Sequence, residues 1–166
     1  RRQRQMCKET GIKEGDPLEI FTDREGQIIL KKYSPIGELS EFASGYVESL
    51  NKITGHISII TDRDTVIAVS GTSKKDLLEQ KISPDLEKIF NTRQRFVGDG
   101  SNSIFITEKG NKDKEIKPQV ICPIISDGDV IGSVVLISKD DNTKMEKTEE
   151  EVASVAATFL GSQMEI

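Results

Sequence analysis

Several residue types on which catalysis and metal binding depend are scarce in this 166-residue chain. It has one histidine, two cysteines and no tryptophan. His56 directly follows a glycine that ends a predicted helix, so we interpret it as a surface or satisfied polar residue, with a catalytic base as the alternative. Neither cysteine has a Cys or His at metal-ligand spacing, and no glycine-rich phosphate-binding motif is present. The sequence therefore predicts no metal, no cofactor and no enzymatic activity.

Long apolar runs are also missing. No segment approaches the length of a membrane span, and no signal peptide opens the chain. Cys7 and Cys122 lie far apart in sequence without a pairing pattern, which predicts reduced thiols in a cytoplasmic protein without membrane contact. With 5% aromatic residues, the core is expected to be aliphatic.

The net charge of −5 is unevenly distributed. Residues 1–33 hold eight Lys or Arg against six Asp or Glu, an excess of two positive charges, so the remainder carries −7. A basic end on an acidic body suggests two functions, although so small an asymmetry also arises by chance.

The first regular element predicted is a β-hairpin over residues 14–33. Asp23-Arg24-Glu25-Gly26 has the composition of a turn, in which Gly26 adopts positive φ. Apolar residues occupy both arms: Leu18, Ile20, Phe21, Ile28, Ile29 and Leu30. An isolated two-stranded hairpin is marginally stable in water, so this one needs a partner.

A helix is predicted next, over residues 35–54. Ser34 and Pro35 suit its start, and apolar residues recur at gaps of three and four, with Phe42 and Val47 widening the stripe. The stripe consists of Ile36, Leu39, Ala43, Tyr46, Leu50 and Ile53. Such a helix packs either on its own domain or also on its twin from another chain.

The rest of the chain reads as an α+β domain with a mostly antiparallel sheet, whose first and last helices cover one face. Strands are predicted at 56–60, 65–69, 103–107 and on both sides of a turn at 126–129, with a bulge or close backbone approach at Gly132. Short helices are predicted at 73–80 and from Ser83, and an amphipathic helix runs from Val152 to Met164. Residues 108–117 are dense in charge and are expected to form a mobile, solvated loop.

A domain of this kind often binds a small molecule between its sheet and the covering loops. Cys122, Pro123 and Ile124 on one strand, and Ser70 and Thr72 at the end of another, are candidates for lining such a site. Plain core packing is the alternative for each of them.

Three stretches taken together resemble a known family. KEGDPLEIFTDREGQIILKKYSPIGELSEFA looks like the second half of an AbrB-type swapped-hairpin module with its linker helix. GHISIITDRDTVIAVSGTSKKD, followed by PIISDGDVIGSVVLISKD and the last helix, resembles the GAF-like sensor domain of the stage V sporulation protein T family. The similarity runs from Gly11 to Met164.

The resemblance implies a cytoplasmic transcriptional regulator of sporulation genes, an activator or repressor that binds duplex DNA. It implies a partial AbrB-like module at 1–33, a linker helix at 34–55 and a GAF-like sensor domain at 56–166. Two chains would pair through the hairpin and helix 35–54, and two such dimers would form a homotetramer through sensor-domain helices, with Val152 to Met164 as a candidate surface. An unidentified small-molecule effector is expected in the sensor domain.

The module of this family begins with a strand of the type GRVVIPKE and then a short helix with paired arginines. The sequence given lacks that strand, and an ungapped alignment places Cys7-Lys8 at the arginine positions. Arg1, Arg2, Arg4 and Lys8 are the candidate phosphate-binding residues. The alternatives are a sensor or oligomerisation domain whose DNA-binding module is incomplete and inactive, and an enzyme on a GAF-like scaffold.

Overall fold

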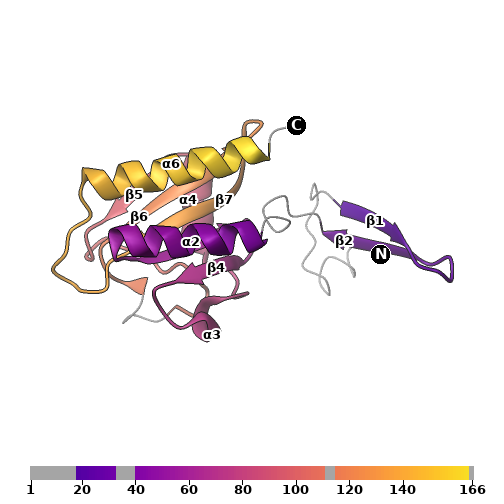
Figure 1. Cartoon of the computed structure of the whole chain (residues 1–166), viewed down its shortest axis with the longest axis horizontal. Coiled ribbons are helices and arrows are strands. Elements are labelled where there is room, and N and C mark those ends of the chain that lie inside the picture. Colours follow the sequence, from indigo (N-terminus) through magenta and orange to yellow (C-terminus); the bar gives the residue numbers. More distant parts are fainter. Residues whose placement is uncertain (1–17, 33–39, 111–114, 165–166) are drawn as a thin grey trace. The chain divides into compact units, whose positions relative to one another are not determined.

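The computed structural model describes residues 18–32, 40–110 and 115–164. They fall into two compact units, with the division between residues 35 and 36. The elements, in chain order, are β1 (Leu18–Thr22), β2 (Ile28–Lys32), α2 (Ser40–Thr54), β3 (Ile57–Asp62), β4 (Val66–Ser70), α3 (Lys74–Leu77), α4 (Pro84–Thr92), β5 (Phe96–Gly98), β6 (Gln119–Ser126), β7 (Asp129–Ile137) and α6 (Lys147–Gln163) (Figure 1).

The first unit is the predicted hairpin. Strands β1 and β2 are antiparallel, with Ile20 opposite Leu30 and Phe21 opposite Ile29. The carboxylate of Asp23 accepts hydrogen bonds from the backbone N–H groups of Glu25 and Gln27 at 2.9 and 2.8 Å. Gly26 has φ +82°, which suits a residue without Cβ. The sequence-based assignment of this turn is confirmed.

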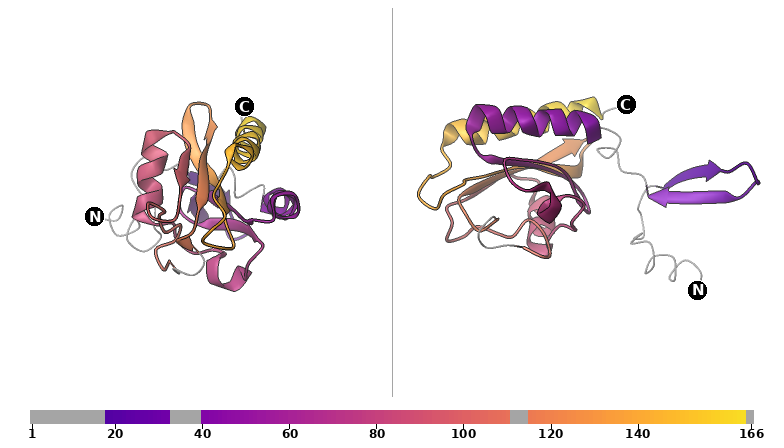
Figure 2. Two further views of the ribbon diagram at one scale, coloured as in Figure 1. Left: turned by 90° about the vertical axis from the view of Figure 1, so that its left-hand side faces the viewer. Right: turned by 60° about the horizontal axis from the view of Figure 1, so that its bottom comes forward.

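The second unit is an antiparallel sheet of five strands in the order β4-β3-β7-β6-β5. Helices α2 and α6 cover one face of the sheet and α4 covers the other, as the end-on view in Figure 2 shows. The α+β architecture predicted from the sequence is thereby confirmed, including the placement of the first and last helices on one face. Because both faces are covered, the central strands β3 and β7 are buried over most of their length and lack polar alternation.

Two apolar clusters, one on each face, hold these layers together. The upper cluster joins α2 and α6 to the sheet, and includes Ala43, Val47 and Leu50 from α2 and Ala156 and Leu160 from α6. The lower cluster joins α3 and α4 to the opposite face, through residues that include Leu77, Leu86, Ile89 and Phe90.

Gly132 lies where β7 meets β3, at the position predicted for a close backbone approach. A Cβ atom built there would lie 2.0 Å from the carbonyl oxygen of Thr61. The register between β6 and β7 also shifts at Ile124 and Ile125. A glycine is therefore required for the strands to pair at this point.

The prediction of a strand at 103–107 is wrong. The segment forms only an isolated bridge, between Ile82 and Thr107. Side chains take the backbone groups that a neighbouring strand would use: the amide of Gln119 bonds both the N–H and the carbonyl of Ile104, at 3.0 and 3.1 Å. The strand at this point of the chain is instead β5, whose three residues are too few for a periodic pattern.

The prediction that the charges of 108–117 are all solvated is also wrong. Glu115 is fully buried. Its carboxylate accepts hydrogen bonds from the backbone of Ile106 and Thr107 and from the Thr107 hydroxyl. Hydrogen bonds from these three donors offset the cost of removing the side chain from water. The pattern of charges in the sequence does not reveal the donors.

Candidate functional site

The outer surface of α2 and α6 carries the exposed apolar side chains of the helices. We call Phe42, Ile53, Val155 and Phe159, together with the half-buried Tyr46 that also packs against the core, the outer helical face. Ile53 and Val155 are 77% and 65% exposed. Both helices therefore have more apolar surface than the sheet covers, since other residues of each helix already supply the core contacts. Exposed apolar surface of this extent is typical of an interaction site.

Three aromatic rings are grouped on this face near the start of α2 and the end of α6. The ring of Phe159 stacks on those of Phe42 and Tyr46, with centroids 5.8 and 5.9 Å apart and interplanar angles of 28° and 29°. Partial burial raises the pKa of Tyr46 above its ordinary value, so its hydroxyl stays protonated at neutral pH. The cluster is an apolar platform with the Tyr46 hydroxyl as its polar edge.

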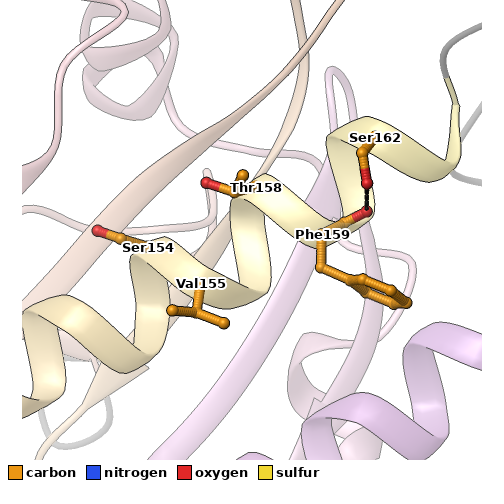
Figure 3. A pocket seen from close by; sticks show the side chains of 5 residues that line it. All are labelled: Ser154, Val155, Thr158, Phe159 and Ser162. Atoms are coloured by element: carbon orange, nitrogen blue, oxygen red, sulfur yellow. Dashed lines mark hydrogen bonds between the residues drawn. The ribbon is translucent and has the colours of Figure 1, made fainter.

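A shallow, open hollow of about 370 Å³ continues the platform along α6. It is lined by Ser154, Val155, Thr158, Phe159 and Ser162. Figure 3 shows these side chains along the helix, with the Phe159 ring directed toward α2 and the Ser162 hydroxyl donating to the carbonyl of Phe159. A hollow lined by one helix suits contact with another helix better than enclosure of a small molecule.

His56 and Glu149 tie the two helices of this face together at the end away from the aromatic rings. The ring Nε2 of His56 lies 3.3 Å from Oε1 of Glu149. Burial raises the pKa of Glu149, but hydrogen bonds from its own backbone, from His56 and from the Glu146 N–H outweigh that effect and leave the pKa below its ordinary value. His56 is thus a satisfied polar residue, as the sequence predicted.

The hairpin is the second candidate interaction site. Ile20 and Ile28 are 71% and 70% exposed, and lie on the same side of the hairpin as Leu30 according to the register. Phe21 and Ile29 occupy the opposite side and are 46% and 39% exposed. Apolar side chains therefore line both surfaces of a two-stranded sheet.

The structure does not bring the ligand-binding candidates of β6 together with those at the end of β4. Cys122 and Ile124 are buried on β6, in the upper cluster beneath α6. Ser70 ends β4 and Thr72 follows it, both half-buried. Strands β3 and β7 lie between β4 and β6. Binding of a ligand by any of these residues stays a prediction.

The thiol of Cys122 is in a buried environment beside α6. Its sulfur lies 3.6 Å from the hydroxyl of Ser154. Burial raises the pKa of this thiol, which keeps it protonated and unreactive at neutral pH. The proposed phosphate-binding residues Arg1, Arg2, Arg4 and Lys8 lie outside the described residues.

Two groups of residues were missed by reasoning from sequence. The stacking of Phe42 on Phe159 joins residues more than a hundred positions apart, and no local pattern pairs them. Glu115 lies in a segment with several similar charges, so nothing in the sequence distinguishes it from Glu108, which is exposed. Within the described ranges, no three His, Cys, Asp or Glu side chains are grouped to hold a metal ion.

The arrangement of strands and helices defines a GAF-like domain. The second unit's fold is shared by a GAF/HD domain protein from Geobacter sulfurreducens, with a TM-score of 0.57 and 21% identity, covering 81% of this chain and 98% of that one. It is shared also by the GAF domain of a phosphoenolpyruvate-protein phosphotransferase from Coxiella burnetii, with a TM-score of 0.60 and 13% identity, covering 97% and 89% of the two chains.

Sequence similarity then identifies the family. The model of the stage V sporulation protein T C-terminal transcription factor family matches residues 38–165. Stage V sporulation protein T of Bacillus subtilis (strain 168) is 45% identical over 154 residues, which are 93% of this chain and 84% of that protein. The chain belongs to the stage V sporulation protein T family of sporulation transcription factors.

Proposed function

We propose that this protein is a homotetrameric regulator of sporulation genes that binds duplex DNA through its N-terminal module and senses an effector through its GAF-like domain. The proposal is regulatory rather than catalytic, and it places the protein in the cytoplasm. No helix of the described part of the chain is long and apolar enough to cross a membrane. The observation that carries the proposal is the hairpin with apolar side chains exposed on both surfaces, in a chain of this transcription factor family.

Pairing with the hairpin of a second chain gives those side chains a core. A lone hairpin of ten strand residues buries too little apolar surface to offset its ordering entropy. Interleaving with the hairpin of a second copy covers both apolar surfaces at once. In a twofold-symmetric pair, the apolar side chains of each copy are covered in the same way. We therefore infer a dimer through residues 1–33 and the linker helix, with the basic residues Arg1, Arg2, Arg4 and Lys8 at the phosphate backbone.

The α6 part of the outer helical face supports assembly of two such dimers. Val155 and Phe159 are exposed on α6, within the stripe from Val152 to Met164. The α2 part of the face is available to the linker-helix contact within each dimer. Phe159 stacks on Phe42, so the two contacts adjoin. The sensor domain at 56–166 is thereby connected to the linker helix at 34–55, so that an effector which favours one packing of α2 biases the DNA-binding ends.

The proposed DNA binding is tested by removing positive charge from the N-terminal residues and, as a control, from α3 and α4. Replacing Arg1, Arg2 and Arg4 with Gln should lower the affinity for mixed-sequence duplex DNA and reduce the slope of log affinity against log salt by up to about 2.7 per chain. The matched control replaces Lys74, Lys75 and Lys88 on α3 and α4, and should leave the slope unchanged. Equal effects of the two triple variants would contradict the assignment.

The dimer is tested by Ile20→Asp, which puts a charge on one apolar surface of the hairpin. We expect light scattering to show half the mass of the unaltered protein, with loss of DNA binding and an unchanged thermal transition of the second unit. Arg24→Asp, in the exposed turn, is the control for added negative charge and should keep the mass. A full-sized assembly of the Ile20→Asp variant would contradict pairing through the hairpin.

A further inference from the structure

Glu115 is a buried acid with an unusual set of partners. Its exposed fraction is 0%. Oε2 accepts hydrogen bonds from the backbone N–H groups of Ile106 and Thr107 at 2.8 and 3.2 Å, and Oε1 accepts one from the Thr107 hydroxyl at 2.7 Å. Among the residues that the structure describes, three donors from two successive residues therefore converge on one carboxylate.

We call these three donors the carboxylate cradle. Successive backbone N–H groups form a concave site for anions, and a side-chain hydroxyl at the second residue completes contact with both oxygens of a carboxylate. Hydrogen bonds to an ionised acceptor are shorter and stronger than those between neutral groups, so the cradle offsets the desolvation of a charge. Nothing in this donor set is specific to a glutamate that belongs to the same chain.

The cradle borders the lower apolar cluster. Thr107 bridges to Ile82, and both Ile82 and Ile106 belong to that cluster, with exposed fractions of 3% and 0%. Aliphatic side chains therefore lie beside the cradle. Small aliphatic carboxylates have groups that match both.

The backbone that carries the cradle's donors is held in place by hydrogen bonds that do not belong to a strand-to-strand ladder. Gln119 bonds Ile104 on both its N–H and its carbonyl, and the Ser83 N–H donates to the carbonyl of Ile106 at 2.8 Å. These bonds do not involve the Glu115 carboxylate. The donors thus have a support that persists when another carboxylate takes the place of Glu115.

We propose that the cradle is a binding site for a small aliphatic carboxylate, and that Glu115 is an internal ligand which fills it until a free carboxylate replaces it. The effector role of this site rests on the proposed function of the GAF-like domain as a sensor. A tethered carboxylate competes at an effective concentration in the millimolar range, which lowers the apparent affinity of the unaltered chain for a free one.

The test uses the full chain and Glu115→Ala, with sodium acetate and sodium propionate as probes and sodium chloride at equal ionic strength as the control. The substitution leaves three buried donors without an acceptor, so we expect the thermal midpoint to fall by about 5 °C or more. Acetate and propionate should restore it saturably and chloride should not. The apparent dissociation constant for acetate should be at least tenfold higher for the unaltered chain than for Glu115→Ala.

A second substitution locates the binding. Adding Thr107→Val to Glu115→Ala removes the hydroxyl donor, and the acetate-dependent rise in midpoint should become smaller. An equal rise in chloride and acetate would overturn the proposal. If Glu115→Ala does not fold in buffer alone, folding in acetate but not in chloride supports the cradle, and failure in both overturns it.

The link to regulation is measured separately, as the affinity of Glu115→Ala for duplex DNA with and without acetate. A change of severalfold is expected. Stabilisation by acetate with an unchanged DNA affinity would retain the site and overturn its effector role. If the unaltered chain does not bind DNA, the proposed function is contradicted, whatever the outcome of the acetate titration.

Discussion

Val155→Asp tests whether the outer helical face joins two dimers. Val155 is 65% exposed on α6, so its replacement removes little of the core of the domain. Complete burial of a valine side chain contributes about 1.5–3 kcal/mol. The exposed part of Val155 therefore corresponds to about 1–2 kcal/mol, and separating a tetramer into two dimers exposes it on all four chains. The expected loss is about 4–8 kcal/mol, or a factor on the order of 10³ to 10⁶ in the tetramer–dimer dissociation constant.

The assay is sedimentation equilibrium over a dilution series, with circular dichroism to confirm that the second unit is folded. The control is Ile125→Asp, because Ile125 on β6 is 39% exposed and lies outside the outer helical face. We expect Val155→Asp to give dimers at concentrations where the unaltered chain and Ile125→Asp give tetramers. A folded Val155→Asp variant that dissociates like the unaltered chain would refute the assignment of this face.

Three further predictions concern the fold that presents these surfaces. Gly132→Ala should lose about 2 kcal/mol or more of unfolding free energy in urea titration, because a Cβ atom would lie 2.0 Å from a backbone oxygen of β3; an unchanged midpoint would refute the close approach. Ser83→Ala should lose about 1–2 kcal/mol in the same assay, because the hydroxyl accepts the Leu86 N–H at 3.1 Å at the start of α4 and donates to a backbone carbonyl; a loss near zero would contradict the cap. The pKa of Glu149 is lowered in the folded state, so its contribution to stability is present above the pKa of an unfolded glutamate, about 4.3, and is lost as pH falls through the folded pKa. Glu149→Gln should therefore flatten the acid limb of the stability curve, and a limb as steep as that of the unaltered chain would contradict the shift.

Local patterns in the sequence sufficed for the hairpin and its turn, for α4 and for the strands on either side of the turn at 126–129. In each of these, the information lies within a few neighbouring residues: a capping serine before a proline, an Asp-Gly turn or a run of β-branched residues. The helix pattern at 35–54 predicted an apolar stripe. It did not separate the residues that face the sheet from Phe42 and Ile53, because that division depends on where α6 lies.

The errors have a common physical cause. The strand predicted at 103–107 has the right composition, but Gln119 and Glu115 supply hydrogen bonds that a ladder would otherwise supply. These partners are up to fifteen residues distant and carry no signal of their role. The carboxylate cradle could not be predicted from the sequence for a related reason: two of its three donors are backbone N–H groups, which almost every residue possesses.

The most direct test of the account as a whole is the binding of the unaltered chain to mixed-sequence duplex DNA, followed by fluorescence anisotropy across a salt series, with light scattering in the same buffer. We expect a tetramer whose DNA affinity falls steeply as salt rises, because phosphate contacts release counterions. An intact tetramer that does not bind DNA at low salt would contradict it, and would leave a sensor and oligomerisation domain without DNA-binding activity.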